Sequence, residues 1–325
     1  MKTINFFSSF HTGDIFTTKP FVKHVMEDLT DFDIGYYHSN HPKILRDLNI
    51  KHRGDSNFGH SVRFVEQENT LNINTWIGAY CPYWNSAPPH CIVSPTDNSI
   101  LGKGSNLNSL SCVWQHIFDK INSFFGTSLV LKEKLEYIPT IDYSFFNIKN
   151  HKKFIEDRGE TKKILLCNGV PMSGQSIQND MSNVINHFAQ KYPSYDFICT
   201  KKISTSLSNV FFTDDILVPD DEIVAVNVPW NDRMNGICDL NEISYLSTHC
   251  NLIIGKQSGP FCYCITKENL MNPEKYIIAF SKTADDGTAC TIDIECDYLL
   301  STDHDLYCND TQYVIDTIEE KLCLI

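Results

Sequence analysis

Apolar and polar positions along the chain follow two different periods, and the period changes in a regular order. Short apolar runs typical of buried strands are followed by segments in which apolar residues recur every three or four positions, as on one face of a helix. Strands are predicted at residues 3–9, 33–37, 69–80, 163–168, 195–199, 210–212 and 251–254, and helices at 17–29, 41–48, 110–125, 181–191, 239–248 and 310–322. This β-α-β-α order predicts an α/β fold with parallel sheets.

The pattern is interrupted in two places. Residues 81–111 hold four prolines among Gly, Ser and Asn, which predicts an irregular excursion. The segment 136–139 and the basic, polar run 149–163 replace apolar periodicity with charge and turn residues, as in a crossing between lobes. Since 325 residues exceed one typical core, we predict two lobes, at residues 1–150 and 151–325.

Composition limits which classes of partner and which cellular compartment are expected for this protein. A formal net charge of −13, from 40 acidic and 27 basic residues, would repel a phosphate backbone, so nucleic acid is not expected as a partner. A small phosphorylated ligand stays compatible, because helix N-termini bind phosphate locally. The 13 cysteines lie in apolar strings without a CxxC pair, which predicts free thiols in a reducing compartment. With no run of ~18 apolar residues and no signal-peptide core, we expect a cytoplasmic protein.

The first glycine-bearing loop, His11-Thr12-Gly13-Asp14, follows the first strand directly. Ligands of open α/β sheets bind beyond the carboxyl ends of the strands, where such loops converge. Gly13 permits close approach of a ligand, and a carboxylate at Asp14 can accept a proton from an attacking hydroxyl, with His11 assisting or orienting. The alternative is that Asp14 is an N-cap and His11 an ordinary hydrogen-bonded loop residue.

The second loop of interest, 255–260, follows a buried strand of the second lobe. Ser258 and Gly259 can offer a hydroxyl and backbone N–H groups to a phosphate, although the string matches neither GxGxxG nor a Walker loop. The alternative is a strand-to-helix turn that ends at Pro260. A cleft between two such lobes would bring both glycine-bearing loops face to face, with one substrate on each lobe.

Further candidates for nucleotide-sugar contacts come from neighbouring loops of the second lobe. They are Asn168, Ser173, Gln175, Lys201 and Glu242, with Gln257 beside Ser258. A carboxylate at Glu242 can bond ribose hydroxyls, although a helical surface position is the commoner explanation for a glutamate. The pair His38 and His41 has no third ligand at metal spacing, so we assign no metal and expect no cofactor.

Two short motifs together resemble the bacterial heptosyltransferases and related glycosyltransferases of the GT-B fold. The first is the string from Gly13-Asp14 to Pro20, and the second is the string from Asp239 to Gly255 and on through Gln257-Ser258-Gly259-Pro260. The motifs lie about 240 residues apart and cover little of the chain. The resemblance implies two Rossmann-like lobes that face each other across a cleft.

This resemblance implies that the chain catalyses an inverting, metal-independent sugar transfer. The lobe 151–325 would hold a nucleotide-sugar, and the lobe 1–150 would hold a glycan or glycolipid acceptor, with peripheral membrane contact possible. Asp14 would be the base, and Ser258 and Gly259 would hold the donor phosphates. The sequence departs from the family at Gln257, where an acidic residue is usual.

Two other functions remain open at this point. One is another nucleotide-sugar enzyme, such as an epimerase, that uses the same cleft. The other is a sugar-binding protein that has kept the fold and lost activity, which the neutral Gln257 favours. Gly13-Asp14 favours the transferase, because a pure binding protein needs no base.

Overall fold

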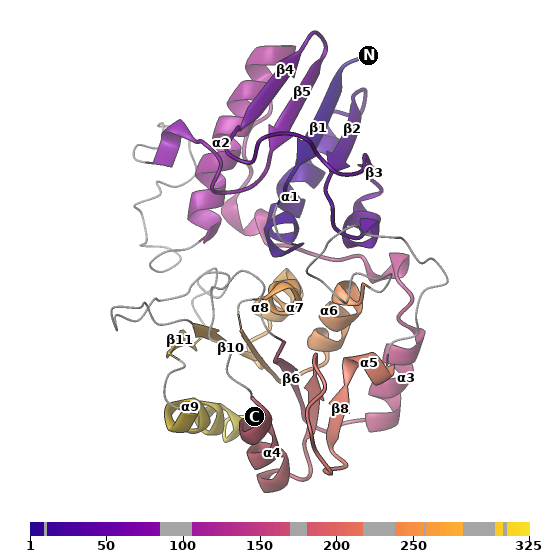
Figure 1. The fold of residues 1–325 in the computed structure, drawn as a ribbon, viewed down its shortest axis with the longest axis vertical. Helices are drawn as coiled ribbons and strands as arrows, with labels where there is room; N and C mark the ends of the chain where they lie inside the picture. Colours follow the sequence, from indigo (N-terminus) through magenta and orange to yellow (C-terminus); the bar gives the residue numbers. More distant parts are fainter. Residues whose placement is uncertain are drawn as a thin grey trace. The chain divides into compact units, whose positions relative to one another are not determined.

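A computed structural model describes residues 1–9, 12–84, 106–169, 181–216, 238–256, 258–281, 303–307 and 311–325. These residues form two compact units, one with residues 1–145 and Cys238, the other with residues 146–216 and 239–325. Each unit has its own sheet with helices packed on it (Figure 1). The predicted architecture of two α/β lobes is confirmed, whereas the cleft between them stays a prediction.

The first unit, here unit 1, is built around a mostly parallel sheet. Its elements are β1 Thr3–Phe7, α1 Thr12–Asp28, β2 Asp33–Tyr37, η1 Pro42–Leu48, β3 Lys51–His52, β4 Phe64–Gln67, β5 Thr70–Asn74, η2 Pro82–Trp84, α2 Asn106–Phe125, η3 Lys134–Tyr137 and η4 Tyr143–Phe145. The strands lie in the order β3-β2-β1-β5-β4, and among them only β4 is antiparallel to its neighbour. β1 is therefore central, with β2 and β5 on its two sides (Figure 1).

Aromatic side chains fill the core of unit 1 between α1 and α2. The ring of Phe21 on α1 stacks on Trp114 of α2 at 5.0 Å between centroids and on Tyr137 at 3.9 Å. All three side chains are almost completely buried. Such rings bury roughly 150–250 Å² each, so this stack removes a large apolar area from solvent between α1 and α2.

The second unit, here unit 2, contains the remaining elements. They are α3 Lys149–Arg158, β6 Lys163–Cys167, α4 Ser182–Lys191, β7 Asp196–Cys199, β8 Val210–Phe212, α5 Thr213–Ile216, α6 Leu240–Thr248, β9 Leu252–Lys256, α7 Gly259–Cys264, α8 Lys267–Leu270, β10 Tyr276–Ser281, β11 Asp303–Tyr307 and α9 Thr311–Leu322. Helix α9 packs on the core of this unit through Ile318 and Leu322. No helix that the structure describes is long and apolar enough to cross a bilayer.

The sheet of unit 2 has the strand order of a doubly wound dinucleotide-binding fold. Its described strands lie in the order β11-β10-β9-β6-β7-β8, and all of the neighbouring pairs are parallel. Numbered within the unit, this is the order 3-2-1-4-5-6, in which the chain direction across the sheet reverses between β6 and β9. A Rossmann-like topology is thus confirmed for unit 2.

The start of α1 differs from the prediction. The helix begins at Thr12, so Gly13 and Asp14 belong to its first turn rather than to a loop, and Pro20 lies inside the helix rather than in its first turn. An acidic residue in the first turn is favoured by the helix dipole, which explains how a turn-like string becomes helical. The Thr17 and Thr18 hydroxyls donate to the carbonyl oxygens of Asp14 and Ile15.

Several other elements also differ from the sequence pattern. Residues 149–158 of the polar run 149–163 form α3, and the predicted helix 41–48 is the 3-10 helix η1, with His41 as its N-cap. Strand β5 ends at Asn74, so the rest of the predicted strand 69–80 is a loop. The strands β3, β4, β10 and β11 were not predicted at all.

Candidate active site

Each unit has one topological switch point, where ligands of open α/β sheets bind. In unit 1 the point lies between the carboxyl ends of β1 and β5, and in unit 2 between those of β6 and β9. The segment after β1 leads into α1 with Gly13 and Asp14, and the segment after β9 leads into α7 with Ser258. Both motifs singled out in the sequence therefore flank a switch point within their own unit.

Asp14 occupies the first turn of α1 and is partly exposed. Gly13 beside it is buried, so the backbone of this turn is packed against the unit while the Asp14 side chain reaches its surface. A half-exposed carboxylate at this place can meet a ligand and still be held by a rigid helix. His11, predicted to assist Asp14, lies outside the described residues.

A buried hydroxyl pair joins β2 to the segment that follows β5. The hydroxyl groups of Tyr36 on β2 and Thr75 after β5 are 2.5 Å apart, and Tyr36 is fully buried. Burial raises the pKa of Tyr36, and the negative charge of Asp14 raises it further. The Asp14 carboxylate is thus near enough for its charge to act on Tyr36. Sequence reasoning missed Tyr36 and Thr75, since only the register of β2, β1 and β5 brings them together.

In unit 2, the structure joins two of the predicted donor-binding residues. The Asn168 side-chain amide donates to the Lys201 carbonyl oxygen at 2.9 Å, and its Oδ1 accepts from the Lys201 N–H at 2.9 Å. This pairing ties the carboxyl end of β6 to that of β7. The Lys201 side chain itself is exposed and extends from this edge of the sheet.

Ser258 immediately precedes α7 and has an extended backbone with φ −146°. Its Oγ is buried and makes no hydrogen bond to any residue that the structure describes. Gly259 and Pro260 form the start of the helix. A Cβ on Gly255 would lie 2.1 Å from the Phe261 ring, so the glycine allows α7 to pack closely on β9. A buried hydroxyl without a protein partner suits a ligand oxygen.

Glu242 lies in the first turn of α6 and is 1% exposed. The alternative of a helical surface position is therefore wrong. A glutamate is rarely buried without a specific role, because burial disfavours its charged form. Three further candidates, Ser173, Gln175 and Gln257, lie outside the described residues, so the structure does not place them.

His38 and His41 of unit 1 are engaged in local hydrogen bonds. The ring of His38 bonds through Nδ1 to the Asn40 carbonyl oxygen at 3.0 Å, and the Nδ1 atom of His41 accepts the Lys43 N–H. Burial lowers the pKa of His38 to about 3, with nearby His52 acting in the same direction. Among the described residues, no group of three or more His, Cys, Asp or Glu side chains has a metal-binding arrangement.

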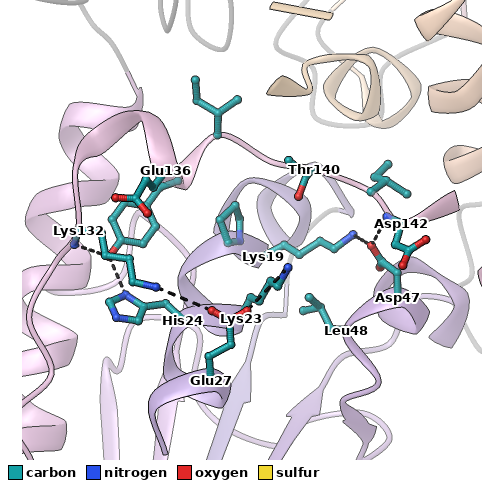
Figure 2. Close-up of a pocket in the computed structure, with 14 residues that line it drawn as sticks. Lys19, Lys23, His24, Glu27, Asp47, Leu48, Lys132, Glu136, Thr140 and Asp142 are labelled. Carbon is teal, nitrogen blue, oxygen red and sulfur yellow. Dashed lines mark hydrogen bonds and ion pairs between the residues drawn. The ribbon is translucent and has the colours of Figure 1, made fainter. Parts of the chain in front are cut away.

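A pocket of about 350 Å³ lies beside α1 in unit 1 and is lined by residues of α1, η1 and the segment 132–142 (Figure 2). Lys19 and Asp47 form a nearly fully buried ion pair at 2.5 Å, and the Asp142 N–H donates to the same carboxylate. Burial lowers the pKa of Lys19 against the effect of Asp47. Three lysines face four carboxylates, so the lining charges nearly cancel. The lining includes none of the predicted site residues, and we interpret this ion pair as a structural tie.

No family model and no curated protein matches this chain. Among solved structures, it is similar to a glycosyl transferase family 9 protein from Veillonella parvula, with 12% identity, a TM-score of 0.46 and coverage of 98% of this chain and 89% of that one. It is also similar to the E. coli ADP-heptose LPS heptosyltransferase II, with 10% identity, a TM-score of 0.49 and coverage of 99% of both chains.

A third similar structure is UDP-GlcNAc 2-epimerase from Neisseria meningitidis bound to UDP-GlcNAc. Here the identity is 12%, the TM-score is 0.45, and the match covers 98% of this chain and 91% of that one. Because these TM-scores lie below 0.5, we base the function on this chain's own residues.

Proposed function

We propose that this protein is a glycosyltransferase that moves a sugar from a nucleotide-sugar to a hydroxyl group of an acceptor. Unit 1 binds the acceptor, a glycan or glycolipid, and unit 2 binds the donor. The transfer inverts the anomeric centre and needs no metal. The observation that carries this proposal is the partly exposed carboxylate of Asp14 at the switch point of unit 1.

In the proposed reaction, Asp14 accepts the proton of the acceptor hydroxyl as the oxygen attacks the anomeric carbon of the donor sugar. A new C–O bond forms while the bond to the nucleoside diphosphate breaks, and the leaving group departs as an anion from the opposite face. A positioned general base typically accelerates such a step 10²–10⁴-fold, according to a general estimate. His11, before Asp14 in sequence, assists or orients this base.

Donor recognition belongs to the edge of unit 2 around β6 and β9. The Ser258 hydroxyl and the Gly259 N–H donate to the diphosphate, and Pro260 fixes the turn that presents them. We assign further donor contacts to Asn168, Lys201, Ser173 and Gln175, and a ribose contact to Glu242. The neutral Gln257, beside Ser258, contacts the donor without adding negative charge near the phosphates. We place the reaction in the cytoplasm, with a glycolipid acceptor reached by peripheral membrane contact.

The first experiment is a thermal-shift screen of the full chain against UDP-, ADP-, GDP-, dTDP- and CMP-sugars with EDTA present. A ligand that binds the native state raises the midpoint by an amount set by its affinity and concentration. We expect at least one donor to raise the midpoint. If none did at millimolar concentrations, the donor site would be wrong.

The epimerase alternative makes a different prediction in the same samples. An epimerase interconverts free nucleotide-sugars when no acceptor is present, whereas a transferase leaves the donor unchanged or hydrolyses it slowly. Proton NMR of the donor after incubation separates the two outcomes. A sugar-binding protein without activity would show the thermal shift and no chemistry with any acceptor.

A further inference from the structure

The loop that follows β5 in unit 1 is held by a buried guanidinium. Arg63, 2% exposed, donates to the carbonyl oxygens of Asn74 and Ala79 at 2.6 Å, of Trp76 at 2.9 Å and of Tyr80 at 3.0 Å. It forms no ion pair with a carboxylate among the described residues, and burial lowers its pKa to about 10. Burying a charge without an ion-pair partner costs free energy unless hydrogen bonds compensate. Here the hydrogen bonds of Arg63 to the loop carbonyl oxygens compensate for burial and fix the conformation of the loop.

A second buried side chain ties this loop to a neighbouring turn. The amide of Asn74 donates to the carbonyl oxygens of His60 at 2.8 Å and Val62 at 3.1 Å, and its Oδ1 accepts the Trp76 N–H at 3.0 Å. Asn74 is 1% exposed. Residues 60–63 and 74–80 therefore form one rigid surface feature, here the braced rim.

Tyr80 stands out on the braced rim because it is 69% exposed between two buried residues, Ala79 and Cys81. Its N–H donates to the Ser61 carbonyl oxygen at 3.3 Å, and its own carbonyl oxygen accepts from Arg63. The exposure thus belongs to a fixed backbone. A single exposed tyrosine is ordinary in itself, but the backbone that carries this one is fixed by hydrogen bonds to Arg63 and Ser61.

The braced rim and Asp14 flank the same switch point. Asp14 follows β1 and the rim follows β5, the parallel neighbour of β1, and the Thr75 N–H donates to the Phe7 carbonyl oxygen at 2.9 Å. A ligand whose hydroxyl meets Asp14 would extend along the carboxyl edge of the sheet toward β5.

We propose that Tyr80 stacks on a pyranose ring of the acceptor and so determines which acceptors this enzyme accepts. The inference rests on the proposed function, because a glycan or glycolipid acceptor brings a sugar to the place beside Asp14. The face of an aromatic ring is electron-rich and attracts the polarised axial C–H groups of a pyranose. A tyrosine side chain also offers a flat contact surface and loses little conformational entropy on binding, because it has only two side-chain torsions. Since the braced rim already fixes the backbone, binding costs little further backbone entropy.

The test is saturation-transfer difference NMR on the full chain without donor. The probes are methyl β-D-glucopyranoside, methyl β-D-galactopyranoside and methyl α-D-mannopyranoside. The variants are Tyr80→Ala, Tyr80→Phe, which keeps the ring, and the matched control Val130→Ala at an exposed apolar position, 72% exposed. We expect wild type, Tyr80→Phe and Val130→Ala to transfer saturation to the ring protons of at least one glycoside. In Tyr80→Ala, we expect this signal to be about fivefold weaker.

Equal signals in wild type and Tyr80→Ala would overturn the inference, as would no signal for any glycoside in wild type. An unchanged thermal midpoint of Tyr80→Ala shows that lost signal is not lost folding. If no nucleotide-sugar stabilises the protein while Tyr80→Ala still loses the glycoside, the proposed transfer fails and the sugar contact stands. If donors bind and Tyr80→Ala behaves as wild type, only the tyrosine assignment fails.

Discussion

The helices beside the two switch points begin with chemically different residues. In unit 1, α1 starts with Thr-Gly-Asp and has a carboxylate in its first turn, whereas α7 in unit 2 follows Ser258 with Gly-Pro and has no acidic residue there. A helix start beside the switch point thus offers a proton acceptor in unit 1 and hydrogen-bond donors in unit 2. The fold gives the location of a site, and two or three residues decide what it does.

The two places also differ in how their polar groups are satisfied. In unit 1, the buried hydroxyl groups of Tyr36 and Thr75 bond to each other. In unit 2, the buried Ser258 Oγ has no partner among the described residues. We therefore expect substitutions at Asp14 to affect chemistry and substitutions around Ser258 to affect binding.

The largest effect is expected from Asp14→Asn, which removes the base and keeps the shape of the side chain. Turnover should fall about 10²–10⁴-fold, while the thermal shift with donor stays as in wild type. The matched control is Asp31→Asn, at an exposed position after α1. Turnover of Asp14→Asn near the wild-type rate would show that the base lies elsewhere.

Gly255→Ala tests the close packing of α7 on β9. The new Cβ would lie 2.1 Å from the buried Phe261 ring, so ring and helix must shift. We expect the free energy of unfolding, measured by urea denaturation, to fall by about 1–3 kcal/mol, with weaker donor binding. The control Gly169→Ala meets no atom within 4 Å and should change stability little. Equal stability of both variants would contradict this packing.

Ser258→Ala tests whether the buried hydroxyl serves a ligand. Since its Oγ bonds to no described residue, the variant should be as stable as wild type without donor. Loss of one hydrogen bond to a phosphate should raise the donor Kd roughly tenfold, measured by calorimetry. Ser206→Ala, at an exposed position of the same unit, is the control. An unchanged Kd would remove Ser258 from the donor site.

The smallest effect concerns the acid sensitivity of unit 1. His38 has a folded-state pKa of about 3, below its ordinary value, so the unfolded chain binds the proton first as the pH falls. The free energy of unfolding therefore falls as the pH drops below about 6.5, by no more than about 1.4 kcal/mol per pH unit. His38→Asn should give a flatter curve of unfolding free energy between pH 7 and pH 5. A curve parallel to that of wild type would contradict a neutral buried His38.

Apolar periodicity was enough to find most of the fold. Strands such as β2 and β6 and helices such as α2 and α4 are confirmed because each carries the period of its own element. The polar helix α3 lacks an apolar stripe, so sequence alone did not reveal it. It packs against α5 and α6 through contacts that only the assembled unit supplies.

The candidate site was predictable where a motif follows a strand. Gly13-Asp14 and Ser258-Gly259 lie at switch points because the order of elements places them there. Burial of Glu242 and the meeting of Tyr36 with Thr75 depend on how helices and strands pack, which spacing along the chain does not encode. The bracing of Tyr80 by Arg63 depends likewise on the antiparallel β4.

The central claim is tested most directly by following the donor sugar itself. A nucleotide-sugar labelled with ¹³C at the anomeric carbon is incubated with the full chain, EDTA and a panel of glycan acceptors, and the products are read by NMR. We predict one new anomeric signal of inverted configuration and an equal amount of free nucleoside diphosphate. Retained configuration, or no transfer to any acceptor from a donor that binds, would contradict it.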